Sequence, residues 1–236
     1  MYPHRRNIER SKKRKEIPDI TTTTAEEAIQ KLAKGKASDH MGLTAEHFKK
    51  GGQTIANYTA ALLNAAKKDY NIPEVLKTGL LTHVLKKEKD PKIPGNYRGI
   101  AVTPVLGKIL ESILKDHTEP TLTNVQNPMQ RRFTEKTSPI NAAVVATEGI
   151  NEANDNGKTV SITTLDAENT FDKLVHNILF RKLYHYNIDD DAWIAIRMLQ
   201  TEATTKVKWK GKFSTGFLTP QGIRQGAKLS PTLYKS

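Results

Sequence analysis

Residues 161–172, SITTLDAENTFD, hold the side chains whose types and spacing could do chemistry. A β-branched run ends at Asp166, and an aromatic residue, Phe171, is followed at once by a second acid, Asp172. A strand that ends in a carboxylate places it at the rim of a sheet, where ligands are commonly bound. A turn capped by an acid has the same sequence, and a pair of carboxylates could also cleave a glycosidic bond. This segment alone leaves all three interpretations open.

Helices that could position this segment are indicated by apolar residues at spacings of three and four. One helix is expected to begin at Thr24, which forms a capping-box pattern with Glu27, and to end before Gly35. Another is expected to end at Asn156-Gly157, a pair typical of a C-terminal cap in the left-handed conformation. Further helices are predicted in residues 43–52, 54–70, 105–120, 139–155, 173–186 and 189–202.

Strands are indicated by β-branched and aromatic residues between turn signals. Residues 79–104 predict two short strands around a basic loop that contains prolines, and residues 158–166 predict a strand that ends at Asp166. Residues 204–219 alternate and turn at Lys210-Gly211, which predicts a hairpin. Ser230-Pro231 has the form of a helix start. This mixture of helices and strands indicates an α+β body.

The charge of the chain points to a polyanionic partner. The 236 residues carry a formal net charge of +12 and a pI near 9.7, which favours nucleic acid first and an anionic membrane second. No apolar run approaches the roughly 18 residues that a membrane span requires, so no membrane partner is expected. The absence of cysteine excludes disulfides and thiolate metal sites.

The first 20 residues are expected to be a disordered basic tail. Residues 1–16 hold seven Lys or Arg against two Glu, a net charge of +5, which leaves +7 on the remaining 220 residues. The SKKRK run at 11–15 could be a nuclear-import patch or a solvated tail. Nothing behind it has the apolar segment of a signal peptide, so an intracellular location is expected, with the nucleus plausible and otherwise unknown.

Five segments, in order along the chain, resemble the sequence blocks of reverse transcriptases from non-LTR retrotransposons. The resemblance runs from about residue 25 to the last residue, and departs from the family pattern at Arg132, Thr170 and Ala227. The five are GKASDHMGLTAEHFKKGG (35–52), the strand, basic loop and helix of 79–114, NPMQRRFTEKTSPINAA (127–143), TLDAENTFDKLVH (164–176) and QGIRQGAKLSPTLY (221–234).

The resemblance implies a nucleotidyl transferase that uses template RNA or DNA, a primer, dNTPs and Mg²⁺. It makes Asp166 the catalytic, first metal-binding aspartate, with the backbone carbonyl of Ala167 as a further metal ligand. Phe171 would be a steric gate against the ribose 2′-hydroxyl, and Asp172 would be structural. The implied nucleotide-binding residues are Lys86, Lys87, Arg98, Phe171, Gln225 and Gly226, although Lys86 and Lys87 could equally form a solvated basic loop.

The implied fold is the fingers and an incomplete palm of a right-hand polymerase, in residues 21–236, with a helical N-terminal extension. The family's second acidic block, Ala-Asp-Asp, is expected some tens of residues after LSPTLY and does not occur in the 236 residues. Asp189, Asp190 and Asp191 precede the Gln-Gly block and are expected to start a helix instead. The chain is therefore expected to be inactive alone. A non-catalytic nucleic-acid-binding remnant is the alternative from another class.

Overall fold

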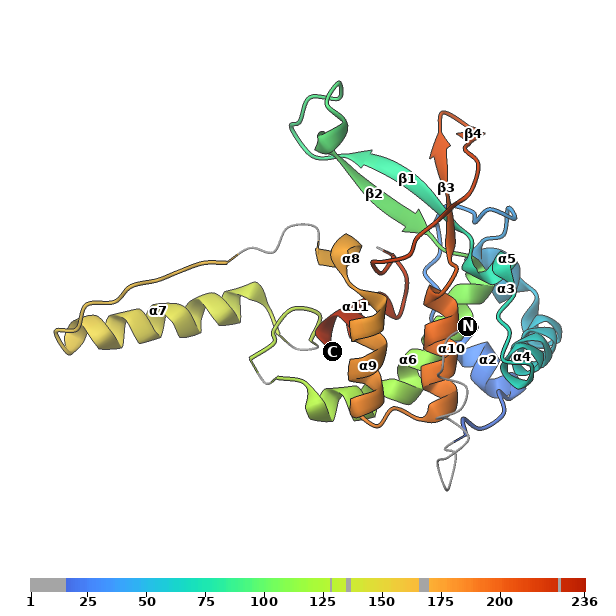
Figure 1. The fold of residues 1–236 in the computed structure, drawn as a ribbon, viewed down its shortest axis with the longest axis horizontal. Coiled ribbons are helices and arrows are strands. Elements are labelled where there is room, and N and C mark those ends of the chain that lie inside the picture. Colours follow the sequence, from blue (N-terminus) through green and yellow to red (C-terminus); the bar gives the residue numbers. More distant parts are fainter. Residues whose placement is uncertain (1–15, 128, 135–136, 166–169, 225) are drawn as a thin grey trace.

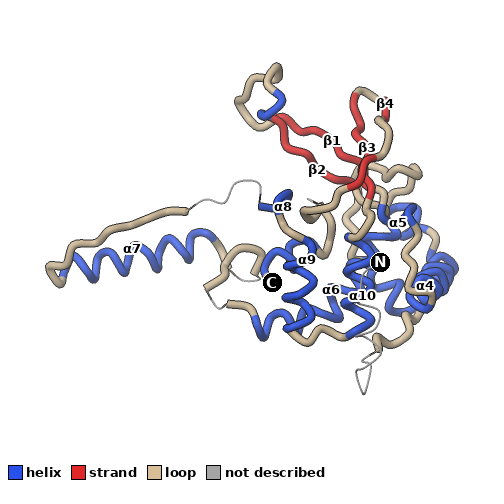
Figure 2. Tube along the Cα trace, in the orientation of Figure 1, coloured by secondary structure: helices blue, strands red, loops and turns tan. Residues whose placement is uncertain are grey.

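In the computed structural model, residues 16–127, 129–134, 137–165, 170–224 and 226–236 are described. Packed helices form the body of the molecule, and one small sheet stands on it (Figure 1 and Figure 2). A long helix projects from the opposite side. The mixed α and β composition predicted from the sequence is confirmed.

Four helices form the N-terminal part of the body. They are α2 (Thr22–Gln30), α3 (Ala45–Lys50), α4 (Gly52–Lys68) and α5 (Glu74–Lys77). The N-cap of α2 is Thr21, whose hydroxyl accepts a hydrogen bond from the Thr24 amide at 3.1 Å. The predicted cap at Thr24 is therefore wrong by one turn, because another threonine in the same run reaches an amide three residues on.

The remaining helices of the body surround α6 (Val105–Val125). They are α9 (His176–His185), α10 (Asp190–Gln200) and α11 (Ser230–Lys235). Ile109 of α6, Leu183 of α9 and Ile196 of α10 have no exposed surface and lie in one hydrophobic core. The predicted helix start at Ser230 is confirmed, although the N-cap is Leu229.

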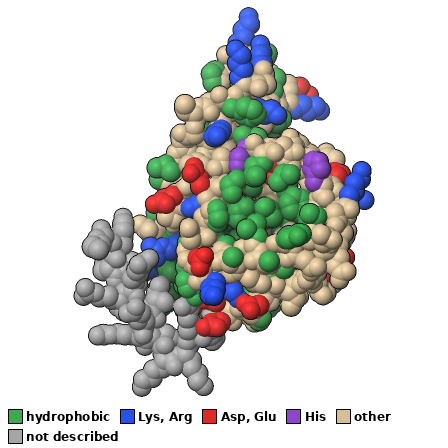
Figure 3. All heavy atoms as spheres, turned by 90° about the vertical axis from the view of Figure 1, so that its right-hand side faces the viewer, with side chains coloured by type: hydrophobic (Ala, Val, Ile, Leu, Met, Phe, Trp, Pro, Cys, Tyr) green, Lys and Arg blue, Asp and Glu red, His purple; other side chains and the backbone are tan. Residues whose placement is uncertain are grey.

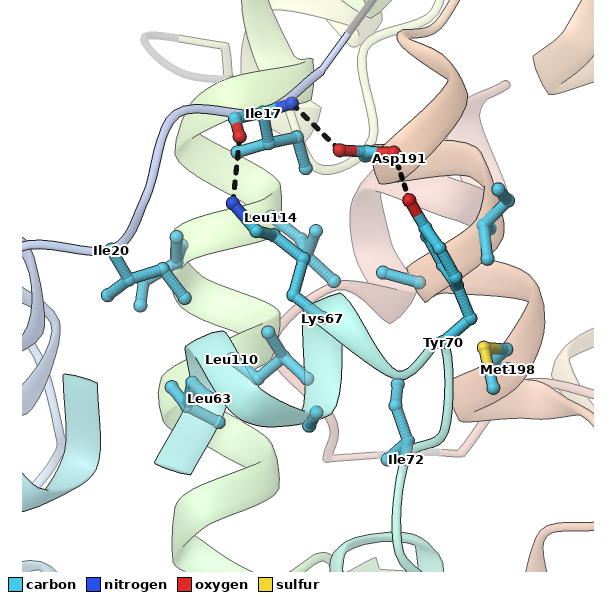
Figure 4. Close-up of a pocket in the computed structure, with 14 residues that line it drawn as sticks. Ile17, Ile20, Leu63, Lys67, Tyr70, Ile72, Leu110, Leu114, Asp191 and Met198 are labelled. Atoms are coloured by element: carbon cyan, nitrogen blue, oxygen red, sulfur yellow. Dashed lines mark hydrogen bonds between the residues drawn. The ribbon is translucent and has the colours of Figure 1, made fainter. Parts of the chain in front are cut away.

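The segment before α2 is part of the body rather than of a tail. Ile17 and Ile20 are buried in the hydrophobic core. The Ile17 amide donates to Asp191 at 3.3 Å, and Lys67 donates to the Ile17 carbonyl at 3.0 Å (Figure 4). Asn64 bonds both backbone groups of Ile20, at 2.8 and 2.9 Å. The boundary predicted at residue 20 is therefore too late. Residues 1–15 lie outside the described part of the chain.

The five strands form one sheet. They are β1 (Gly79–Leu85), β2 (Tyr97–Val102), β3 (Thr204–Trp209), β4 (Lys212–Phe213) and β5 (Phe217–Leu218). The order is β2-β1-β3-β4, and β5 also pairs with β3. β1 is antiparallel to β2 and parallel to β3, and a short 3₁₀ helix, Pro94–Asn96, lies in the β1–β2 loop. Both predicted hairpins form, and Lys210 and Gly211 have positive φ (46° and 79°) in the β3–β4 turn.

The projecting helix is α7 (Pro139–Asp155), which ends as predicted at Asn156 and Gly157, where φ is +66°. The strand predicted in residues 158–166 is wrong. Residues 158–165 form no strand and are exposed, and Leu165 is 94% exposed. No described strand lies alongside them to complete a hydrogen-bonded ladder, and β propensity alone does not hold a strand. The short helix α8 (Thr170–Lys173) follows.

Candidate functional site

The segment 220–229, in which the resemblance places the Gln-Gly block, packs against α8. The Ile223 amide donates to the Phe171 carbonyl, and the Gly222 amide donates to the Leu174 carbonyl, both at 2.7 Å. Gly222 has a φ of +81°, and a Cβ there would lie 2.9 Å from the carbonyl oxygens of Phe171 and Asp172. Glycine is therefore required for this close approach of two backbones.

The Phe171 ring lies in a cluster with two other rings. It stacks on Tyr234 at 5.0 Å with an interplanar angle of 9°, and it meets Phe133 edge-on at 5.9 Å. Phe133 also meets Tyr234 edge-on at 6.0 Å. Three of the five blocks thus converge on one aromatic cluster. Neither Phe133 nor Tyr234 was expected at the site from the sequence, although both are the aromatic residues of their blocks.

Gly226 joins this region to the sheet. A Cβ on Gly226, whose φ is +105°, would lie 2.9 Å from the Ala101 carbonyl oxygen and 3.9 Å from the Ile100 side chain. Arg98 is two residues before Ile100 on β2, so the two side chains share a face, about 7 Å apart along the strand. The structure thus brings Gly226, Phe171 and the strand of Arg98 into one region. Arg98 itself is exposed.

Asp172 points elsewhere than Phe171. It lines a cleft of about 290 Å³ together with Leu81, Gly99 and Ala101, whose side chains lie on the sheet face opposite to Arg98. The segment 217–224 forms the other wall of this cleft. A position on the opposite face agrees with the structural rather than nucleotide-binding role expected for Asp172.

Lys86 and Lys87 lie at the far end of the β1–β2 hairpin. The Lys86 ammonium donates to the Gly95 carbonyl at 2.9 Å, across the loop. Lys87 is 93% exposed and lies 3.6 Å from Glu88. The Lys86 amide bonds the Asn96 carbonyl, about four residues or 13 Å along β2 from Ile100. The structure does not bring these two lysines to Gly226.

Three expected site residues, Asp166, Ala167 and Gln225, lie outside the described residues. Within the described part of the chain, no group of three His, Asp or Glu side chains could hold a metal ion. The described residues therefore do not supply a complete magnesium site. In the same described part, no helix is long and apolar enough to cross a membrane.

A buried ion pair holds the segment that carries Gly226. Arg224 lies 3.6 Å from Glu111 of α6, and the two side chains are only 7% and 1% exposed. Glu111 also accepts a hydrogen bond from the Lys228 amide at 2.7 Å, and Arg224 donates to the Lys77 carbonyl at 2.8 Å. Burial raises the pKa of Glu111, and the Arg224 guanidinium opposes that rise. One carboxylate thus grips the chain on both sides of Gly226.

Sequence reasoning missed both members of this pair. Glu111 belongs to the helix and Arg224 to the Gln-Gly block that carry the resemblance, so the signal was present without an assigned role.

A family model described as "Reverse transcriptase (RNA-dependent DNA polymerase)" matches residues 84–236. Over 228 residues the chain is 24% identical to the "Transposon TX1 uncharacterized 149 kDa protein" of Xenopus laevis, covering 96% of this chain and 17% of that protein. It is 24% identical over 160 residues to a "Retrovirus-related Pol polyprotein from type-1 retrotransposable element R2" of Popillia japonica, covering 67% of this chain and 22% of that protein.

A third relative is the "Retrovirus-related Pol polyprotein from type-2 retrotransposable element R2DM" of Drosophila melanogaster. The identity is 24% over 164 residues, covering 70% of this chain and 15% of that protein. The chain thus spans about a fifth of the length of these relatives.

Proposed function

The chain belongs to the reverse transcriptase family and is a domain of the non-LTR retrotransposon kind. On that premise, we propose that the region from about residue 16 to residue 236 is the fingers and first part of the palm of an RNA-directed DNA polymerase. Its partners are a template of RNA or DNA, a primer and dNTPs. The basic charge of +12 supports a polyanionic ligand.

One observation carries this proposal. The block of Phe171, the block of Gly226 and the β2 strand of Arg98 are far apart in sequence, yet they meet through hydrogen bonds and a glycine contact. A nucleotide held there would have an aromatic ring on one side and a guanidinium within reach for its phosphates. We assign Arg98, Phe171, Gln225 and Gly226 to the nucleotide on this basis. Lys86 and Lys87 would contact it only after the hairpin closed.

Phe171 is the proposed gate against ribonucleotides. The ring is held by Tyr234 on one face and by Phe133 at its edge, so its position is fixed before a substrate arrives. A fixed ring discriminates better than a mobile one, because a clash with a 2′-hydroxyl cannot be relieved by rotation. In a protein that includes the second acidic block, Phe171→Val should therefore increase ribonucleotide incorporation relative to deoxyribonucleotide incorporation.

Asp166 and the Ala167 carbonyl are the groups proposed to hold Mg²⁺ in the complete enzyme. Polymerase chemistry uses two metal ions about 3.5–4 Å apart, which a single aspartate does not hold. The 236 residues contain no Ala-Asp-Asp block after Ser230. We therefore propose that this chain binds template and primer but does not extend the primer by itself.

Primer extension tests the proposal. The purified chain is mixed with a primed RNA template, Mg²⁺ and dNTPs, with Asp166→Ala as control, and binding is followed in parallel by fluorescence anisotropy. We expect binding that weakens with salt, and no extension. Extension that disappears in Asp166→Ala would overturn the account of the metal site.

Absence of binding would overturn the nucleic-acid function itself. An in-frame reading of the DNA downstream of codon 236 then separates a polymerase, which continues into an Ala-Asp-Asp block, from a binding remnant, which does not.

A further inference from the structure

The β3–β4 hairpin has no assigned role in the proposed nucleotide site. Its sequence in residues 206–213, KVKWKGKF, places a lysine at every second position. The charge around it is of one sign, because residues 203–236 contain seven Lys or Arg and no Asp or Glu. Figure 3 shows Lys and Arg side chains at the end of the molecule that carries the two hairpins. This end is therefore strongly electropositive.

Two large aromatic side chains are exposed between these lysines. Trp209 is 51% exposed and Phe213 is 56% exposed. In the register of the hairpin, Lys208 is opposite Phe213 and Trp209 is opposite Lys212. Each face of the hairpin thus presents one aromatic ring beside one lysine, and the Lys208 ammonium lies 5.8 Å from the centre of the Phe213 ring.

The Trp209 ring is held in place although half of its surface is exposed. It meets His83 of β1 edge-on at 5.9 Å and Tyr97 of β2 edge-on at 6.1 Å. These rings come from three neighbouring strands, so they brace the hairpin against the rest of the sheet. A ligand that stacks on the free surface of Trp209 would therefore lose little energy in ordering it.

Edge protection and membrane binding each account for less of this pattern. Lysines on an edge strand such as β4 prevent edge-to-edge aggregation, but exposed aromatic rings beside them work against that purpose. An anionic membrane also attracts lysines and aromatic rings. However, the register places Trp209 and Phe213 on opposite faces of the hairpin, so one flat surface cannot take both.

We propose that the β3–β4 hairpin binds an unpaired stretch of nucleic acid, with its lysines on phosphates and with Trp209 and Phe213 stacked on bases. Basic grooves that carry aromatic rings bind single strands in this way, with little dependence on sequence. A flexible strand can contact both faces of a narrow hairpin. The inference rests on the proposed function for its class of ligand, and it adds a contact surface outside the nucleotide site.

Aromatic-to-leucine variants test the stacking. Binding of a labelled oligo(dT) strand is measured by anisotropy for the wild-type chain, Trp209→Leu and Phe213→Leu. Each variant should weaken binding by about fivefold or more, without changing the salt dependence. The matched control is Tyr58→Leu, since Tyr58 is 71% exposed on α4, on the face where Figure 3 shows hydrophobic side chains gathered. We expect the control to bind as the wild type does.

Charge variants and tryptophan fluorescence give independent measurements. Lys210→Gln with Lys212→Gln should lower the slope of log affinity against log salt by about 0.7 per lysine, as for single strands. The exposed pair Lys50→Gln with Lys68→Gln, on α3 and α4, should leave that slope unchanged. Oligo(dT) and oligo(U) should both quench the fluorescence of the wild-type chain, and Trp209→Leu should abolish this quenching.

The possible failures are distinguishable. Wild-type binding that every hairpin variant retains would overturn the hairpin assignment and leave the proposed function standing. No binding of any nucleic acid by the wild-type chain would overturn both. Preference for a duplex of equal length, unaffected by Trp209→Leu, would exclude stacking on an unpaired strand. Preference for vesicles of anionic lipid over oligo(dT) would replace nucleic acid by a membrane.

Discussion

Replacing Arg224 by methionine should make the stability of the protein depend more steeply on pH, because it removes the counter-charge of a buried carboxylate. Glu111 has a side chain that is 1% exposed, and Arg224 lies 3.6 Å away. The Lys228 amide also donates to Glu111 at 2.7 Å. Methionine fills much of the volume of the arginine stem, so the substitution changes the charge more than the packing.

The magnitude follows from the protonation of Glu111. Burial raises the pKa of this carboxyl above its ordinary value of 4.5, and Arg224 is the largest opposing influence. Without Arg224, the folded variant keeps Glu111 protonated at pH 7. Each pKa unit corresponds to about 1.4 kcal/mol, so this protonation costs up to about 3 kcal/mol at pH 7. Loss of the bond to the Lys77 carbonyl adds about 1 kcal/mol at every pH.

The sign of the pH dependence is fixed by the direction of the shift. A carboxyl whose folded-state pKa is raised gives stability that is fully present below the unfolded pKa and is lost as the pH rises through the folded pKa. Arg224→Met should therefore lie within about 1 kcal/mol of the wild type near pH 4.5. The gap should widen to about 3 to 4 kcal/mol by pH 7.

Urea unfolding followed by circular dichroism between about pH 4.5 and pH 7.5 measures this difference. The control is the double variant Arg224→Met with Glu111→Gln, in which the amide oxygen still accepts from Lys228 and nothing titrates. Its difference from the single variant should vanish near pH 4.5 and grow with pH. A loss in Arg224→Met that is equal at every pH would refute the reasoning, since the guanidinium would then act through packing alone.

Three further predictions concern the tail, a glycine and a buried aspartate. A chain that begins at residue 16 should lose salt-dependent affinity for duplex DNA, with a slope lower by about 0.9 for each phosphate that the tail no longer neutralises, and should unfold at the same urea concentration. A chain that begins at residue 21 should also be less stable, because it lacks two buried isoleucines. Gly222→Ala should destabilise by about 1 to 3 kcal/mol in urea, through its positive φ and a Cβ only 2.9 Å from two carbonyl oxygens of α8. Asp39→Ala should lower the unfolding free energy by about 2 to 4 kcal/mol, because it deprives the amides of Met41, Leu43 and Val105 of their acceptor.

Apolar spacing predicted the helices well, because a helix satisfies its own backbone and needs only one apolar face for packing. Each predicted helix is present, and the largest error lies at the end of α6. The helix was expected to stop at Pro120, but it continues to Val125 with the proline inside it. Leu122, beyond the proline, is 6% exposed and packs in the core. Burial of that turn outweighs the lost hydrogen bond.

The failed strand at 158–165 has the opposite cause. Val160, Ile162 and Leu165 have the residue types of a strand, but a strand is stable only when a neighbour completes its hydrogen bonds. Sequence composition reports the propensity and not the partner. The β1–β2 and β3–β4 hairpins succeeded because each carries its partner within a few residues. Prediction from local pattern therefore holds for local pairings and fails for distant ones.

The same limit explains which site residues could be foreseen. Apolar spacing assigned one buried side to α6, whereas Gly107, Glu111, Leu114 and Thr118 form a second buried stripe at spacings of three and four. A stripe that contains glycine, a carboxylate and a hydroxyl is invisible to a search for apolar periodicity. A carboxylate can occupy it only because Arg224 and the Lys228 amide meet it there. The position of a buried charge is thus a property of the pair, and α6 alone could not predict it.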